Sequence, residues 1–138
     1  MLAEQFQHMS PELFKQRTKA FALKIMRFTD DLPASRATNV VAGQLLRSGT
    51  SVGANYRAAC RAKSPADFVS KMGTVEEECD ESIYWMELLE ESGKVKPASV
   101  TELKREGSEI LAMVVASINT ARARRQNPQS AIRNPQSK

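Results

Sequence analysis

The chain has 138 residues, of which 41% are hydrophobic and 26% charged, and it carries a formal net charge of +4. This balance predicts one folded domain with a modest core and argues against a disordered chain. No apolar run reaches the roughly 18 residues that a membrane-spanning helix needs, and no signal peptide is recognisable, so we expect a cytoplasmic protein without a membrane partner.

The cysteine and histidine content argues against a metal site. Cys60, Cys79 and the single histidine, His8, are too few for a tetrahedral zinc site within one chain. In a reducing compartment the two cysteines are expected to be buried thiols and not a disulfide. We therefore expect no metal and no cofactor.

Start and stop signals predict two helices in the first half of the chain. The sequence Ser-Pro-Glu at 10–12 combines a cap, a first-turn proline and an early acid. It predicts a helix that runs to about Asp30, just before an Asp-Leu-Pro step. Ser35 can then cap a second helix that runs to about Arg61.

The second half of the chain contains signals for two more helices. Ser64 is followed by a proline, and Asp67 is placed for a bond like that of a capping box, so a third helix is predicted from this point to about Ser92. After a short linker, Ser99 or Thr101 is expected to cap a fourth helix.

Short connections between four helices predict an all-α fold, an up-and-down antiparallel four-helix bundle within residues 1–126. No stretch of the sequence has the pattern of a strand. The remaining residues, 127–138, are polar and contain two Asn-Pro steps. They are predicted to form a disordered C-terminal tail.

The sequence RSGTSVGAN at 47–55 is rich in small and polar residues, and propensity alone predicts a loop. A helical wheel at about 100° per residue instead sorts residues 36–61 onto four faces, which favours a helix. The faces are a core stripe, a polar stripe (Gln44, Ser48, Ser51 and Asn55), a flat face with Gly49 and Gly53, and an arginine face (Arg36, Arg47, Arg57 and Arg61).

These faces leave alternatives open. Gly49 and Gly53 allow close approach of another backbone, which could belong to the same chain or to a neighbouring subunit. The polar stripe is expected to hydrogen-bond into a neighbouring helix. Ser48 and Ser51 have no identifiable general base, so neither is expected to be a catalytic nucleophile.

The third predicted helix is acidic and has two apolar sides. Tyr84 and Trp85 lie away from its main apolar stripe, so either two neighbours enclose the helix or its aromatic side faces another subunit. Glu78 and Glu81 form a Glu-x-x-Glu pair without the histidines of di-iron bundles. A solvated acidic face, or one paired with arginines, is therefore favoured over a metal site.

The chain resembles a bacterial family of four-helix-bundle proteins first noticed as products of intervening sequences in 23S ribosomal RNA genes. The resemblance covers residues 14–123. It is most specific in QLLRSGTSVGANYRAA at 44–59 and in ADFVSKMGTVEEECDESIYWMELLEESG at 66–93, and weaker at Glu109–Ile118. One departure is Ala59, where many relatives carry a glutamate.

The resemblance implies an antiparallel bundle that assembles as a homopentameric ring. The chain is also similar to the accessory variability protein of diversity-generating retroelements, a basic pentamer that binds nucleic acid and a reverse transcriptase. For most members of the family no biochemical activity is established, and a shared fold does not by itself define a function.

Two functions from different classes follow. The first is a non-catalytic, homo-oligomeric scaffold that binds nucleic acid, RNA more than DNA, through basic surfaces. The residues expected to contact phosphates are Arg36, Arg47, Arg57, Arg61, Arg122, Arg124 and Arg125. These arginines could instead pair with the acidic third helix.

The alternative function is an adaptor that recruits a partner protein without binding nucleic acid. Its contact surface would include Tyr84 and Trp85, which are also expected at a subunit interface together with Gly49 and Gly53. An enzyme is not expected, because the sequence shows no nucleophile–base pair, metal-ligand set or phosphate-binding loop.

Overall fold

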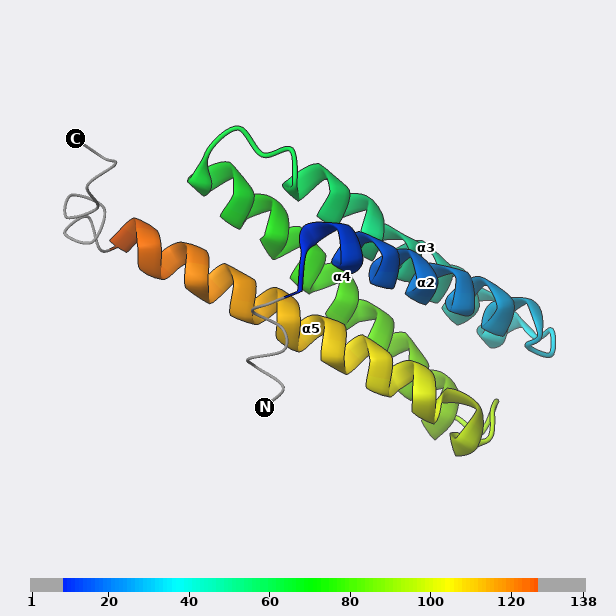
Figure 1. The fold of residues 1–138 in the computed structure, drawn as a ribbon. Coiled ribbons are helices and arrows are strands. Elements are labelled where there is room, and N and C mark those ends of the chain that lie inside the picture. Colours follow the sequence, from blue (N-terminus) through cyan, green and yellow to red (C-terminus); the bar gives the residue numbers. More distant parts are fainter. Residues whose placement is uncertain (1–8, 127–138) are drawn as a thin grey trace, which may run out of the picture.

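The computed structural model describes residues 9–126, which fold into four helices (Figure 1). Their bounds are α2 (Pro11–Asp30), α3 (Arg36–Ala59), α4 (Pro65–Glu91) and α5 (Pro97–Gln126). The described residues contain no strand, so the predicted all-α class is confirmed. The predicted C-terminal tail, residues 127–138, lies outside the described part of the chain.

Each helix packs against the one that follows it in the chain. The contact between α3 and α4 is the most extensive, followed by α4 with α5 and α2 with α3, whereas α2 and α5 touch only sparsely. Successive helices run in opposite directions (Figure 1). This arrangement is the predicted up-and-down antiparallel bundle.

Three helices begin where local chemistry predicts. The hydroxyl oxygens of Ser10, Ser35 and Ser64 each accept a hydrogen bond from the backbone N–H three residues later, at 3.2, 3.1 and 3.0 Å. The Asp67 carboxylate accepts a hydrogen bond from the backbone N–H of Lys63 at 3.0 Å, so it satisfies a second N–H at the start of α4.

The start of the fourth helix differs from the expectation that Ser99 or Thr101 caps it. α5 begins earlier, at Pro97, because the fixed φ angle of proline suits the first turn and its missing N–H needs no partner there. The Thr101 hydroxyl instead donates to the carbonyl oxygen of Pro97 at 2.8 Å, inside the helix.

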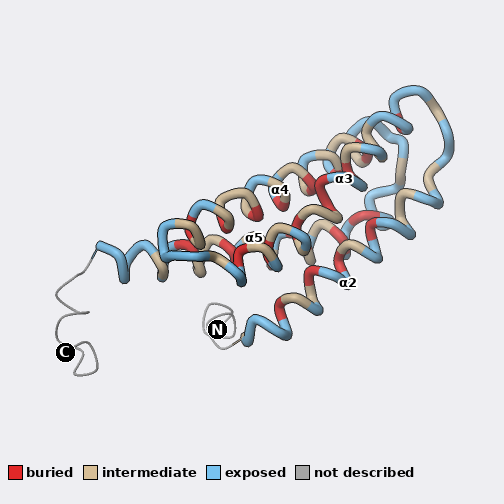
Figure 2. Tube along the Cα trace, turned by 90° about the horizontal axis from the view of Figure 1, so that it is seen from above, coloured by how far each residue is buried: buried red, intermediate tan, exposed pale blue. Residues whose placement is uncertain are grey.

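The core runs along the inside of all four helices, as the buried positions in Figure 2 show. α4 contributes to it on two sides, because it lies between α3 and α5. Its two apolar sides are therefore explained by two neighbours within the same chain. The largest fully buried side chains include Phe21, Ile25, Leu45, Met72, Met86, Leu89 and Ile110.

Ion pairs connect α2 to α5 across their sparse contact. The Arg17 Nε and Nη2 atoms lie 2.8 Å from Glu106 Oε2 and 2.6 Å from Glu109 Oε1. Arg105 also hydrogen-bonds to Glu109. These side chains are partly buried, so the pairs are less screened by water than an exposed surface pair.

Acid should weaken this connection. The hydrogen bond from Arg17 lowers the pKa of Glu109 below its ordinary value of 4.5, and Arg105 acts in the same direction. A carboxyl whose pKa is lower in the folded state stabilises the fold above its unfolded-state pKa. That contribution disappears as the pH falls through the folded-state pKa.

We therefore expect Glu109→Gln to have a lower free energy of unfolding than wild type at about pH 7, and to lose less of it on acidification to about pH 3.5. Urea denaturation at the two pH values measures both effects. Glu77→Gln on the exposed face of α4 is the matched control and should follow wild type. An equal acid loss in Glu109→Gln and wild type would mean that Glu109 is not the acid-sensitive group.

Candidate nucleic-acid interface

The antiparallel topology brings arginines from distant parts of the sequence to one end of the bundle. The end of α3, the start of α4 and the end of α5 lie at the same end in Figure 1. Five predicted phosphate-binding residues are exposed there. We call this group the basic end: Arg57, Arg61, Arg122, Arg124 and Arg125.

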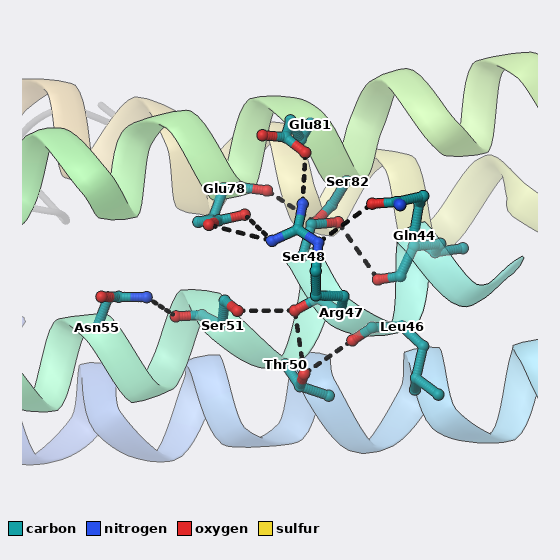
Figure 3. Close-up of polar contacts among 11 residues, drawn as sticks. Gln44, Leu46, Arg47, Ser48, Thr50, Ser51, Asn55, Glu78, Glu81 and Ser82 are labelled. Atoms are coloured by element: carbon teal, nitrogen blue, oxygen red, sulfur yellow. Dashed lines mark hydrogen bonds and ion pairs between the residues drawn. The ribbon is translucent and has the colours of Figure 1, made fainter. Parts of the chain in front are cut away.

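The other two predicted arginines lie elsewhere. Arg36 is the first residue of α3, at the opposite end of the bundle. Arg47 lies midway along α3, where its Nη1 is 3.1 Å from Glu78 Oε1 and its Nη2 is 2.6 Å from Glu81 Oε1 (Figure 3). For Arg47 the structure therefore shows pairing with the acidic helix, which the sequence left as an alternative.

The basic end adjoins a groove that the sequence did not reveal. α4 and α5 extend beyond the end of α3 and the start of α2 (Figure 1), which leaves part of their inner surface uncovered. The groove has a volume of about 1350 Å³, and we call it the end groove. Its lining includes the cations Lys15, Lys63, Arg124 and Arg125, and among residues 9–126 no Asp or Glu contributes to it.

Two of these cations, Lys15 and Lys63, were missed as candidate site residues. Lys63 does belong to a run without acids, residues 32–66, and that run was a usable signal. Lys15 gave no signal, because it is separated from the other cations in sequence and approaches them only through helix packing. Its one ion pair within residues 9–126 is a loose 3.9 Å approach to Glu12.

The floor of the end groove is mostly apolar. It includes Tyr56, Phe68 and Met113, with alanines and small hydroxyl side chains between them. The Tyr56 ring packs edge-on against Phe14, with ring centres 4.6 Å apart. Burial raises the pKa of Tyr56, so its hydroxyl is neutral and adds no negative charge to the groove.

Only one member of the predicted polar stripe bonds to another helix. Ser48 is fully buried, and its Oγ lies 3.0 Å from the Oγ of Ser82 on α4. The Ser51 hydroxyl donates to the carbonyl of Arg47, and the Asn55 amide donates to that of Ser51. The stripe therefore bonds mainly within α3, contrary to the expectation (Figure 3).

Gln44, the fourth member of the stripe, accepts a hydrogen bond from Arg47 Nε at 3.1 Å. This contact also stays within α3. Together with the two acids of α4 it holds the Arg47 guanidinium in one orientation across the seam between the helices (Figure 3).

Gly49 and Gly53 face α2 of the same chain. A Cβ atom on Gly49 would lie 2.3 Å from Ile25 Cδ1, and one on Gly53 would lie 3.0 Å from Thr18 Oγ1. Both neighbours are fully buried. The requirement for glycine is thus explained within one chain, and the two residues give no support to a subunit interface.

Tyr84 and Trp85 lie on the outer part of α4 with their rings 5.0 Å apart. Tyr84 is 50% exposed, whereas Trp85 is half-buried and packs against the core. The Trp85 Nε1 is buried and has no hydrogen-bond partner within residues 9–126. Tyr84 is therefore the residue of this pair that is available to a second molecule.

The cysteines are free thiols, and only one fits the expectation of burial. Cys79 is buried, which raises its pKa to about 12, whereas Cys60 is exposed.

Among the described side chains no group of three or more metal-ligand residues is gathered for an ion. No helix within residues 9–126 is long and apolar enough to cross a membrane.

Comparison with known families identifies the chain. A model described as the 23S rRNA-intervening sequence protein matches residues 13–116. The chain belongs to this family. The match includes α3 and α4 in full and therefore the Arg47 ion pairs, the two packed glycines and the Ser48–Ser82 contact.

A solved structure supports the same assignment. It is the crystal structure of a protein of unknown function from the S23 ribosomal protein family, from Bacteroides thetaiotaomicron. The two sequences are 32% identical, and the superposition covers 80% of this chain and 99% of that one with a TM-score of 0.74. Comparison with curated proteins gives no match.

The packing of the glycine face can be tested by adding a single methyl group. We expect Gly49→Ala to lower the free energy of unfolding by about 1–3 kcal/mol, because the fully buried Ile25 side chain must shift to admit the new methyl group. Gly43→Ala is the matched control, since nothing lies within 4 Å of its added Cβ. It should raise the stability by about 1 kcal/mol through helix propensity.

Combining Gly49→Ala with Ile25→Val removes the Cδ1 atom that the new methyl would meet. Part of the lost stability should then return, although the buried valine leaves less apolar surface in the core. Chemical denaturation of these three variants and wild type measures this. Equal effects of the substitutions at Gly49 and Gly43 would contradict the close contact with α2.

Proposed function

We propose that this protein is a non-catalytic, homo-oligomeric scaffold that binds nucleic acid through its basic end. The observation that carries the proposal is that two exposed arginine groups, from the end of α3 and the end of α5, lie at the same end of the bundle, beside a groove that no Asp or Glu of residues 9–126 lines. These groups are about 60 residues apart in the sequence, and the antiparallel packing brings both to the same end of the bundle.

The local charge supports an anionic ligand. The five arginines of the basic end form no ion pair with a carboxylate within residues 9–126, unlike Arg17, Arg47 and Arg105. Cations in the last turn of a helix also stabilise the helix dipole, but this effect is small and leaves the guanidinium groups exposed to solvent. Arginine binds phosphate oxygens through two parallel N–H donors.

The comparisons make RNA the first nucleic acid to test. The family is named for intervening sequences of 23S rRNA, and the similar solved structure is assigned to a ribosomal protein family. Contacts between arginines and phosphates do not read bases, so binding is expected to tolerate many sequences and to weaken with salt. For a protein that binds RNA in this way, we propose a cytoplasmic location.

A homo-oligomer would multiply such weak contacts. Tyr84 is 50% exposed, and exposed Val40 on α3 is 63% accessible, so apolar surface is available on the outer side of both helices. Aromatic side chains are common at the centres of protein interfaces. The resemblance of the sequence to ring-forming relatives favours a pentamer, in which several basic ends could bind one strand with avidity.

The exposed Tyr84 surface also supports a second candidate, an adaptor that recruits a partner protein. The two functions differ in what nuclease treatment does to a purified complex. A partner that stays bound after nuclease favours the adaptor, and one that is lost favours the nucleic-acid scaffold.

Arginine substitutions test the basic end. We expect the double variant Arg57→Ala/Arg61→Ala and the triple variant Arg122→Ala/Arg124→Ala/Arg125→Ala each to bind RNA more weakly than wild type. Each lost phosphate contact should reduce the slope of log affinity against log salt by about 0.7–0.9. Mobility-shift titrations at several salt concentrations measure both quantities.

Arg36→Ala is the control, because Arg36 lies on the same helix as Arg57 but at the opposite end of the bundle. It should bind RNA as wild type does. Unchanged binding by both multiple variants would remove the basic end as the contact surface. If Arg36→Ala lost as much RNA affinity as the double variant, RNA binding would depend on the total charge of the protein and not on the position of the arginines.

The oligomer can be tested by light scattering after size exclusion. We expect a mass close to five times the 15.3 kDa of one chain. Tyr84→Ser should shift the equilibrium toward smaller species, because it removes exposed aromatic surface from the proposed interface. Thr101→Ser, on an exposed part of α5, should leave the mass unchanged. A monomeric wild-type protein would contradict the ring.

A further inference from the structure

The end groove combines two features that basic surfaces for duplex binding do not need. Its described lining contains four cations, which we call the rim, and mostly apolar side chains that include Phe68, which we call the floor. We propose that this groove binds a single strand of nucleic acid, with phosphates on the rim and bases against the floor. The inference rests on the proposed function and specifies the form of nucleic acid that the basic end takes.

The rim supplies positive charge from three separate elements. Lys15 comes from α2, Lys63 from the connection before α4, and Arg124 and Arg125 from the last turn of α5. Because they come from different elements, a chain of phosphates that follows the groove can pass several cations in turn. No carboxylate from the described lining repels that chain.

The length of the groove suits an extended strand. One wall follows α5 from Met113 to Arg125. At 1.5 Å per residue, this wall is about 18 Å long. A strand lying along it would therefore place several nucleotides inside the groove, and one phosphate could reach Arg124 or Arg125 while another reaches Lys15.

The floor can accept unstacked bases. Phe68 is half-buried and lines the groove, so its exposed part is available for a base to stack on. Ala59, Ala62 and Ala121 line the same groove with small side chains. The hydroxyl groups of Ser117 and Thr120 line the same groove and can hydrogen-bond with base edges or sugars.

The bases of a duplex cannot stack on the floor of the end groove. They are paired and stacked inside the duplex, so only its phosphates reach a protein surface such as the exposed basic end. An acidic amphipathic helix would satisfy the rim charges as well, but the alanines and hydroxyl side chains of the lining give its apolar residues few large contacts. A single strand matches both the charge and this mixture of aromatic, small and hydroxyl side chains, and so we favour it over a protein ligand.

The experiment compares three labelled probes by fluorescence anisotropy: a short oligouridylate, an abasic strand with the same number of phosphates, and a hairpin duplex. Wild type should bind the oligouridylate most tightly. Phe68→Leu keeps an apolar side chain but removes the aromatic face. It should weaken oligouridylate binding about tenfold, within the range for one stacked base, and leave the other two probes unchanged.

Phe28→Leu is the matched control. Phe28 is also half-buried and packed against the core, but it lies near the end of α2 that is remote from the groove. It should bind all three probes as wild type does. Thermal unfolding of both variants, followed by circular dichroism, separates a loss of folding from a loss of binding.

The rim is tested through salt and charge. If all four rim cations neutralise phosphates of a single strand, the slope of log affinity against log salt is about −2.8. A fourfold increase in salt should then weaken oligouridylate binding about 50-fold. Lys15→Ala/Lys63→Ala should reduce the slope and should weaken oligouridylate and abasic-strand binding alike.

The outcomes separate this inference from the proposed function. Equal binding of the oligouridylate and the abasic strand, with no effect of Phe68→Leu, overturns the groove proposal and leaves a charge-based nucleic-acid scaffold in place. Tighter binding of the hairpin duplex than of the oligouridylate would also overturn the groove proposal and leave the charge-based scaffold in place. Failure of all three probes to bind wild type overturns both, and binding of an acidic amphipathic peptide in their place would assign the groove to a protein.

Discussion

The three short connections constrain the whole molecule. Residues 31–35, 60–64 and 92–96 give each connection five residues, which is enough to reverse the chain but too few to cross the bundle. Each helix must therefore lie antiparallel beside the one before it. This constraint places the ends of α3 and α5 at the same end of the bundle, and with them arginines that the sequence separates widely.

Within that framework, α4 is the central element. It packs against α3 and α5, and it has both an apolar core surface and a row of carboxylates toward α3. Arg47 pairs with two of those carboxylates at the edge of the seam, while Ser48 and Ser82 meet inside it. Small buried hydroxyls allow the helices to approach closely, and their mutual contact avoids leaving an unpaired polar group.

The same packing separates arginines that are paired with acids in the middle of the bundle from arginines that are exposed at one end. Acids in the middle of α4 and α5 neutralise nearby arginines such as Arg17 and Arg47. The arginines at the helix ends lie away from these acids, because the acid at the start of α4, Asp67, pairs with Lys71 and the other acids of α4 begin at Glu76. A mild net charge for the whole chain thus coexists with a strongly basic end.

Sequence patterns were sufficient for the fold, because caps, prolines and helical periodicity are local. The starts at Ser10, Ser35 and Ser64 depend on one hydroxyl and one nearby N–H, so they could be predicted directly. The residue that packs against Gly49 could not be predicted, because a small residue indicates that another element lies close by but does not identify that element. The end groove was also beyond reach, since it depends on how far α4 and α5 extend past the other helices.

The sparse contact between α2 and α5 has a dynamic consequence. α2 is held on one side by α3, through the flat face with Gly49 and Gly53, and on the other by a small contact with α5 that includes Arg17 and the approach of Phe21 to Gly107. Elements with few buried contacts open first in native-state hydrogen exchange. We expect the backbone amides of α2 to exchange as one cooperative unit ahead of the α3–α4–α5 core, and Lys15, which forms part of the groove rim, moves with that unit.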